Sequence, residues 1–236
     1  MRNISTIASK EFRSYLASPM AYVVTGIFLL LTGFLFSISS ATYAQTSLTG
    51  FLQPGGMLLL LLASVLTMRL LAEERKLGTI ELLLTAPVKD SEVIAGKFLG
   101  SLGILVSMLA LTFYYPLLLI VFGEPDMGAI GTGYLGLFLL GGASLAVGLF
   151  ASSLTSNQIV AAVVAGGILF SLWFIGMAAN FVPEALGEVI SFVSLAFYFP
   201  DFMTGVIDTR GVIYYLSITA LFLYLAIRSL ENSRWS

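Results

Sequence analysis

The chain has 236 residues, of which 58% are hydrophobic and 10% charged, with a mean hydropathy of +0.99. Soluble domains carry about a quarter charged residues, so this composition indicates an integral membrane protein. The net charge of −2 argues against nucleic acid as a partner, and the chain has neither cysteine nor histidine. A disulfide framework, a thiolate metal site and the commonest general base of enzymes are therefore excluded.

The first element that the sequence predicts is an amphipathic helix over residues 1–18. Apolar residues recur there at helical spacing, and polar and basic residues lie between them. The apolar residues are Ile4, Ile7, Ala8, Phe12, Tyr15 and Leu16. We expect this elbow helix to lie in the membrane interface and to end before Pro19, because the residue before a proline avoids the α conformation. An ordinary solvated lead-in is the alternative interpretation.

Six segments are apolar for long enough to cross a bilayer as helices, which takes about 20 residues. They are residues 20–40, 51–71, 98–122, 134–151, 159–179 and 212–228. Pro54 is tolerated in the opening turn of the second span, and Pro116 is expected to kink the third. A cleaved signal peptide competes for the N-terminus, but the apolar run there is too long and five further spans follow it.

Six spans place both termini on the same side of the membrane. Ten of the eleven basic residues fall on that side, and Arg210 falls on the other. Because cytoplasmic loops are enriched in lysine and arginine, we expect both termini in the cytoplasm, as in a multi-pass protein of the bacterial inner membrane.

Residues 180–210, on the opposite side, are too apolar for a free loop and are broken by Pro183 and Pro200. Two short helices that re-enter the outer leaflet fit this pattern best, since irregular backbone at membrane depth must be covered by protein. A full extra hairpin is the alternative.

Ten of the 24 charged residues lie between 68 and 97, flanked by apolar segments that carry no charge. We interpret residues 72–97 as a cytoplasmic coupling region. Its first residues continue the second span as a charged helical end, and Gly78 breaks that helix. Thr79 can then N-cap a short helix with Glu81 in its first turn, and Asp90 or Ser91 can cap the helix that follows. A plain solvated hairpin is the alternative.

Residues 73–87, Glu-Glu-Arg-Lys-x-Gly-Thr-Ile-Glu-Leu-Leu-Leu-Thr-x-Pro, resemble the cytoplasmic loop of ABC-2 type permeases. The subfamily with the greatest resemblance is that of gliding-motility-associated permeases, relatives of those that serve nitrous-oxide reductase maturation. Residues 10–19, 152–158 and 205–215 also resemble parts of this family. The resemblance implies one all-α permease domain over 1–236 with a type V exporter-like fold: six spans, an elbow helix, a coupling helix between spans two and three, and a re-entrant pair before span six.

The resemblance also implies a separate ABC ATPase that binds ATP and Mg²⁺ and docks on the coupling region. Gly96-Lys97 lacks the serine or threonine of a P-loop, so no nucleotide site is expected in this chain. The chain also lacks histidine, cysteine and any pair of carboxylates within the spans, so no catalytic residue or metal site is expected either. The implied roles are ion pairing with the ATPase, a bend in the chain, fixation of the coupling helix and filling of the groove in which that helix docks. The residues that would carry these roles are Glu73, Glu74, Arg75, Gly78, Thr79, Glu81, Leu82, Leu83, Leu84, Thr85 and Pro87. Helix capping or solvation explains each of these residues equally well.

Other partners follow from the same resemblance. They are a second permease subunit, membrane lipids and an accessory protein with an extracellular domain. Three small-residue pairs permit close helix contact, either between subunits or within one: Gly96 with Gly100, Ser144 with Gly148, and Ala162 with Gly166. The expected spans carry no charge for an ion relay, which counts against a secondary transporter or an ion channel. The resemblance implies ATP-driven export, and the mainly apolar walls are compatible with a lipidic or amphipathic substrate. Force transmission without transport, in a gliding-type complex, is the alternative, and an intramembrane enzyme is disfavoured.

Overall fold

The structure is a computed structural model that describes residues 2–43, 48–79, 88–123 and 125–232, and every regular element in these ranges is helical. The helices in chain order are α1 (Arg2–Ala17), α2 (Pro19–Tyr43), α3 (Thr49–Thr67), α4 (Ala72–Lys76), α6 (Asp90–Leu111), α7 (Tyr114–Phe122), α8 (Met127–Ser153), α9 (Gln158–Phe174), the 3₁₀ helix η1 (Ile175–Phe181), α10 (Glu184–Val193), α11 (Phe199–Met203) and α12 (Thr209–Asn232).

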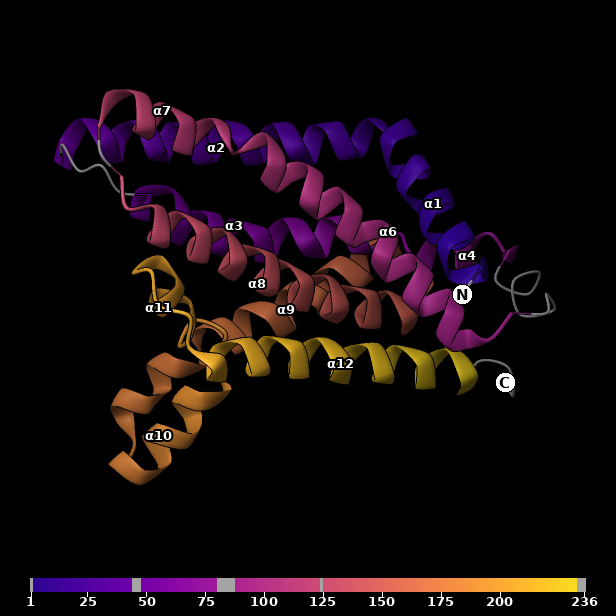
Figure 1. Cartoon of the computed structure of the whole chain (residues 1–236). Helices are drawn as coiled ribbons and strands as arrows, with labels where there is room; N and C mark the ends of the chain where they lie inside the picture. The colour runs from indigo at the N-terminus through magenta and orange to yellow at the C-terminus, as the bar shows by residue number, and fades with distance from the viewer. Residues whose placement is uncertain (1, 44–47, 80–87, 124, 233–236) are drawn as a thin grey trace.

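The described residues contain six helical segments long and apolar enough to cross a membrane, which confirms the predicted fold class. They run alongside one another in an elongated bundle, and both chain ends lie at the same end of it, beside α4 (Figure 1). The helices that contain the third and fourth spans begin at Asp90 and Met127, earlier than the predicted 98 and 134. The residues that α6 adds before its apolar run are partly charged, whereas the residues that α8 adds, 127–133, carry no charge.

The predicted kink in the third span is a turn between α6 and α7. Pro116 lies in the first turn of α7 and has no N–H to donate to the carbonyl of Thr112, four residues earlier. That carbonyl accepts instead from the Tyr134 hydroxyl of α8 at 2.8 Å and from the Tyr115 amide at 3.0 Å. The break in the helix is therefore compensated by a neighbouring span.

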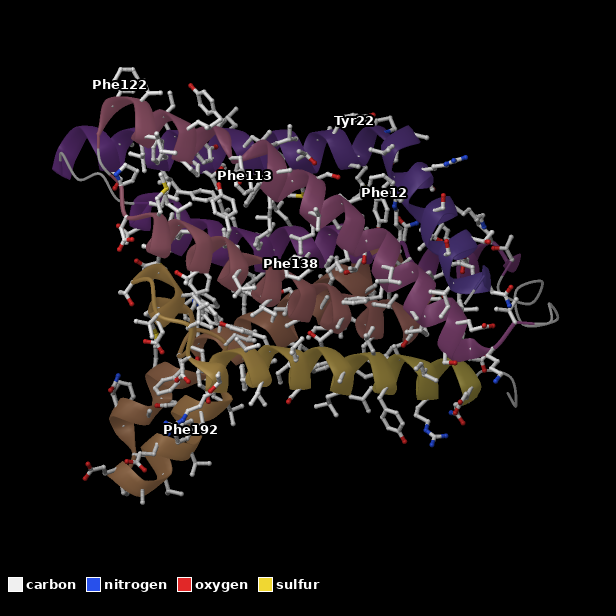
Figure 2. The ribbon with its side chains drawn as sticks, in the orientation of Figure 1. Phe12, Tyr22, Phe113, Phe122, Phe138 and Phe192 are labelled. Atoms are coloured by element: carbon white, nitrogen blue, oxygen red, sulfur yellow. The ribbon has the colours of Figure 1, made fainter. Side chains whose placement is uncertain are left out.

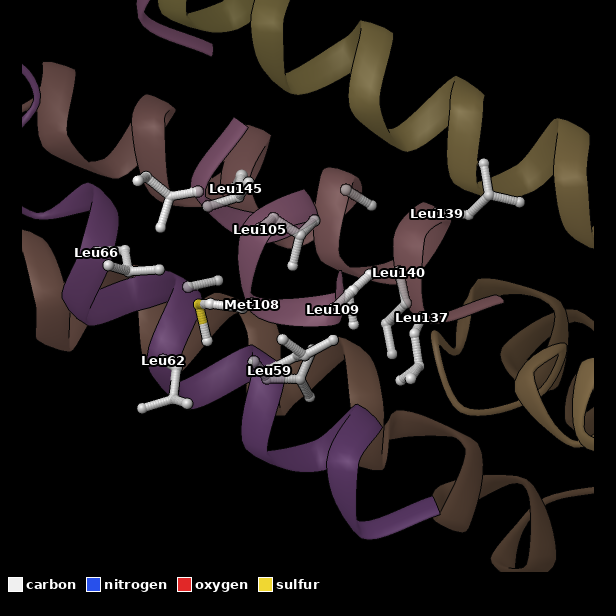
Figure 3. Close-up of a cluster of buried hydrophobic side chains, with 14 of the residues drawn as sticks. Leu59, Leu62, Leu66, Leu105, Met108, Leu109, Leu137, Leu139, Leu140 and Leu145 are labelled. Carbon is white, nitrogen blue, oxygen red and sulfur yellow. The ribbon is translucent and has the colours of Figure 1, made fainter. Parts of the chain in front are cut away.

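The core lies around α8, the most buried of the six spans. Figure 3 shows leucines of α3, α6 and α8 that interdigitate there, among them Leu59, Leu105 and Leu140. A side chain at Gly148 of α8 would collide with Thr67 of α3, so the Ser144–Gly148 pair serves close packing inside one subunit. At the edges of the bundle, Tyr22 and Phe122 point outward (Figure 2) and are 63% and 83% exposed, as expected of a surface in contact with lipid.

The segment before α12 holds two short helices, as predicted, and they differ from each other. α11 folds back on the bundle, where its Phe202 is fully buried and the Phe202 carbonyl accepts from the Thr132 hydroxyl of α8 at 2.7 Å. α10 projects sideways past α12 with the exposed apolar residue Phe192 (Figures 1 and 2). With ten and five residues, neither helix can cross a bilayer, so the alternative of an extra hairpin is wrong.

Candidate functional site at the base of the charged segment

The elbow helix α1 packs mainly against the first half of α6. A Cβ atom at Gly100 of α6 would lie 2.6 Å from the Cβ of Glu11 and 3.1 Å from the carbonyl oxygen of Ala8, so only glycine allows the two helices to come this close. Gly96 is similarly covered by Ile7. The Gly96–Gly100 pair therefore forms a contact within one subunit, and the contact fixes α1 beside the helix that follows the charged segment.

Tyr15 joins α1 to the end of α3. Its hydroxyl donates to the Leu66 carbonyl at 2.8 Å, and the Arg69 guanidinium lies 4.3 Å from the centre of its ring. Arg69 also donates to the Ser18 hydroxyl at 2.8 Å. Burial raises the pKa of the Tyr15 phenol, which therefore stays protonated and remains a donor at neutral pH.

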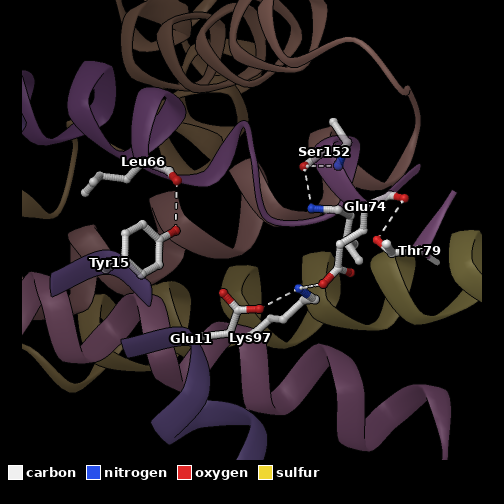
Figure 4. A network of polar contacts seen from close by, with 9 residues as sticks. Glu11, Tyr15, Leu66, Glu74, Thr79, Lys97 and Ser152 are labelled. Carbon is white, nitrogen blue, oxygen red and sulfur yellow. Dashed lines mark hydrogen bonds and ion pairs between the residues drawn. The ribbon is translucent and has the colours of Figure 1, made fainter. Parts of the chain in front are cut away.

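Lys97 of α6 connects three elements through its ammonium group (Figure 4). Its Nζ donates to Glu11 Oε1 of α1 at 2.7 Å and to Glu74 Oε1 of α4 at 2.8 Å. The lysine is 2% exposed, and the side chains of Glu11 and Glu74 are 14% and 21% exposed. A charge this deeply buried requires such partners, because desolvation of an unpaired ammonium costs several kcal/mol.

Ser152, at the end of α8, holds the start of α4 from the other side. Its hydroxyl oxygen accepts from the amides of Leu71 and Ala72, both at 3.0 Å, and its hydroxyl donates to the Met68 carbonyl at 3.1 Å. These amides belong to the first turn of α4, where a helix has no internal acceptors. Ser152, in the last turn of α8, thus also caps α4 and is itself fully buried.

The charged segment does not simply extend the second span. α3 ends at Thr67, and a turn over residues 68–71 precedes α4. The amides of Leu71 and Ala72 donate to the Ser152 hydroxyl, and this is why the helix does not continue through the turn. α6, the helix that follows the charged segment, begins at Asp90. Its N-cap residue is Lys89, and not Asp90 or Ser91 as predicted. There the Glu92 carboxylate accepts from the Lys89 amide at 3.2 Å, which satisfies a backbone donor before the helix.

The structure brings part of the predicted coupling site together. Glu73, Glu74 and Arg75 are half-buried on α4, and Gly78 follows with a φ of +70°, a left-handed conformation that favours glycine at the end of a helix. The Thr79 hydroxyl donates to the Glu74 carbonyl at 3.3 Å. The remaining predicted residues lie outside the described part of the chain: Glu81, Leu82, Leu83, Leu84, Thr85 and Pro87.

A cavity of about 240 Å³ opens at this base. Three acidic and three basic side chains line it, namely Lys10, Glu11, Arg69, Glu73, Glu74 and Lys97. The site therefore presents balanced charge rather than an acidic or basic patch. Across the described ranges, no group of three or more carboxylates is arranged to hold a metal ion.

Sequence reasoning missed the anchors of this site. In the sequence, Tyr15 contributes only to an apolar spacing, Ser152 only to a segment that resembles the family, and Lys97 is only the last charge of residues 68–97. Only the position of Lys97 could have indicated its role. It lies inside one continuous helix, α6, at the point where the charged residues end and the apolar residues begin.

Six apolar helices, with a charged segment held at one end by α1, α6 and α8, define a multi-pass membrane protein. Residues 5–227 match the family described as ABC-2 family transporter protein, and the chain belongs to this family. Its members are permease components of membrane transporters, and the family implies partnership with an ABC ATPase subunit. A search of curated proteins gave no match.

Proposed function

We propose that this chain is the permease subunit that couples ATP hydrolysis by a separate ABC ATPase to export of a lipidic or amphipathic substrate. The observation that carries the proposal is the anchoring of α4. The helix from which the charged segment departs is tied to α6 and α1 through Lys97 and to α8 through Ser152. A force applied to that segment would therefore be passed to several membrane helices together.

Charge and topology support a cytoplasmic position for this base. The start of α1, the end of α12 and α4 lie at the same end of the bundle (Figure 1), and nine of the ten basic residues in the described part of the chain belong to segments at that end. By the positive-inside rule this end faces the cytoplasm of a bacterial inner membrane. ATP and Mg²⁺ would bind to the ATPase, and Glu73 and Arg75 would contact it together with residues 79–87.

The bundle surface supports a second subunit and a lipidic cargo. α9 and α12 are the least buried spans, with exposed apolar residues such as Ile159, Val163 and Leu216. Such faces are suited to lipid or to a second permease subunit. We also propose that the chain belongs to the gliding-motility-associated subfamily and works with an accessory extracellular protein. This part of the proposal rests on the resemblance of residues 73–87 to that subfamily.

Binding to the ATPase tests the first half of the proposal. The permease and its cognate ABC ATPase are co-purified, and the affinity and ATPase rate of the complex are measured. Glu73→Gln combined with Glu81→Gln is expected to weaken binding about three- to tenfold, the usual effect of charges at the rim of an interface. Glu188→Gln, an exposed carboxylate on α10 at the other end, is the matched control. Unchanged binding by the double variant would overturn the assignment of the docking residues.

Lipid movement tests the second half. The complex is reconstituted into liposomes that contain a fluorescent phospholipid, and its transfer between leaflets is followed with ATP and with a non-hydrolysable analogue. ATP-dependent transfer is expected. Stimulated ATP hydrolysis without transfer of lipid would instead support a force-transmitting subunit that transports nothing.

A further inference from the structure

We propose that Lys97 is the positioning residue of the coupling segment, which it holds in register with the elbow helix by bridging Glu74 and Glu11. The inference rests on the proposed function only for its consequence in the ATPase complex. The geometric part concerns the permease alone. Lys97 would act through Glu74 and Glu11, without contact to the ATPase or to any substrate.

The bridge spans long distances in the chain. Lys97 and Glu11 are 86 residues apart, and Lys97 and Glu74 are 23 residues apart, yet the three groups meet at 2.7 and 2.8 Å. Each residue belongs to a different helix, α6, α1 or α4. Lysine is almost never as buried as the 2% exposure found here unless it is paired. The ammonium group is thus the shared point at which three helices meet.

Specific geometry explains this bridge better than stability does. A buried ion pair often contributes little net stability, because desolvation of the charges offsets their attraction, and an apolar replacement can be as stable. Apart from an exposed hydrogen bond from Asn3 Nδ2 to Glu92 Oε2 at 3.2 Å, the remaining contact between α1 and α6 is packing of Ile7 and Phe12 against Gly96 and Gly103, and such packing has little directional preference. Hydrogen bonds from one ammonium to two carboxylates do fix a direction and a register.

Glu74 links the bridge to the coupling segment. Its side chain binds Lys97, while its backbone carbonyl accepts from the hydroxyl of Thr79, one residue beyond the left-handed Gly78. A displacement of the segment at Thr79 would therefore act on Glu74, and through Lys97 on both α6 and α1. The other charged groups around the same cavity, Lys10, Arg69 and Glu73, make no ion pair within 4.0 Å among the residues described.

Removal of all three charges at once separates positioning from stability. The triple variant Glu11→Gln, Glu74→Gln, Lys97→Met leaves no unpaired charge in the interior, and we expect it to unfold at nearly the same SDS concentration as the parent. The double variant Glu11→Gln, Glu74→Gln leaves Lys97 buried without a carboxylate, and we expect it to unfold much earlier.

The distance between α1 and α4 is the readout for positioning. The chain has no cysteine, so Ser5→Cys and Lys76→Cys, both at exposed positions, carry the only two spin labels. We expect a narrow distance distribution in the parent and a clearly broader one in the equally stable triple variant. An unchanged distribution in a stable triple variant would overturn the inference. Should the triple variant not fold, Glu11→Gln alone carries the same test, because Lys97 then keeps Glu74 as its partner.

The ATPase complex provides the second readout. Glu11→Gln removes the link from Lys97 to α1 and leaves every predicted docking residue unchanged, so we expect it to bind the ATPase as the parent does, while its stimulation of ATP hydrolysis should fall about fivefold or more, within the usual range of coupling between sites. Equal stimulation by the parent and by Glu11→Gln would refute the positioning role. A parent permease that neither binds nor stimulates the ATPase would refute the proposed function, while the distance measurement would still decide the role of Lys97.

Discussion

Ser152→Ala removes the hydroxyl that holds the turn before α4. The amides of Leu71 and Ala72 lose their acceptor, and the Met68 carbonyl loses a donor. Ser152 is fully buried, so water has little access to replace the hydroxyl. An orphaned buried backbone group costs about 1–3 kcal/mol, so the two amides together predict a loss of about 2–6 kcal/mol of stability.

Hydrogen exchange and unfolding by SDS measure this effect. Peptides that cover residues 68–77 should exchange faster in Ser152→Ala, because the first turn of α4 is no longer capped. Ser153→Ala is the matched control. Its hydroxyl is equally buried but donates to the Phe150 carbonyl of its own helix at 2.6 Å, and its loss should cost no more than about 1 kcal/mol.

Equal stability and equal exchange in Ser152→Ala and Ser153→Ala would refute the reasoning from orphaned amides. In that case the turn at 68–71 would be held by packing alone, and the anchoring of α4 to α8 would lose its physical basis.

Two further predictions concern the elbow helix. Gly100→Ala should destabilise the protein by about 1–3 kcal/mol, because its Cβ would lie 2.6 Å from that of Glu11. Gly26→Ala, where no atom lies within 4 Å, should be neutral or slightly stabilising, and equal SDS midpoints for the two variants would contradict the close packing. Tyr15→Phe should cost about 1 kcal/mol through the lost hydrogen bond to α3. Tyr22→Phe is the control, because the Tyr22 side chain is 63% exposed, and it should unfold at the same SDS concentration as the parent. An SDS midpoint for Tyr15→Phe equal to that of the parent would refute the contribution of the hydrogen bond to α3.

The spans were predictable because crossing a bilayer is a local demand on the sequence. About 20 consecutive apolar residues are needed, and each of the six runs meets that demand within its own length. The ends of the helices were less accessible. α6 begins before its apolar run because Lys97 finds partners on other helices. α8 begins at Met127 because Asp126 caps it, its Oδ1 accepting from the Gly128 amide at 2.8 Å.

The candidate site was predictable only in part, for a physical reason. The motif at residues 73–87 carries a local signal in its charges, its glycine and its proline. The anchors of α4 carry no local signal, because they are pairs of residues far apart in the chain. Ser152 and Leu71 are 81 residues apart, and Glu11 and Lys97 are 86 residues apart. A serine in a polar turn and a lysine before a span look the same whether or not they have such a partner.

The packing of α1 on α6 has a consequence for how the protein is made. α1 leaves the ribosome before α6, and the surface that receives it is synthesised only after two complete spans, α2 and α3. Until α6 is made, Lys97 does not exist and Glu11 lacks this partner. Lys97 then reaches the membrane boundary together with α6. An amphipathic helix with Lys10 and Arg13 on its polar side can bind an anionic lipid surface during this interval. The N-terminus is therefore expected to be among the last parts of the chain to reach its final place during biogenesis.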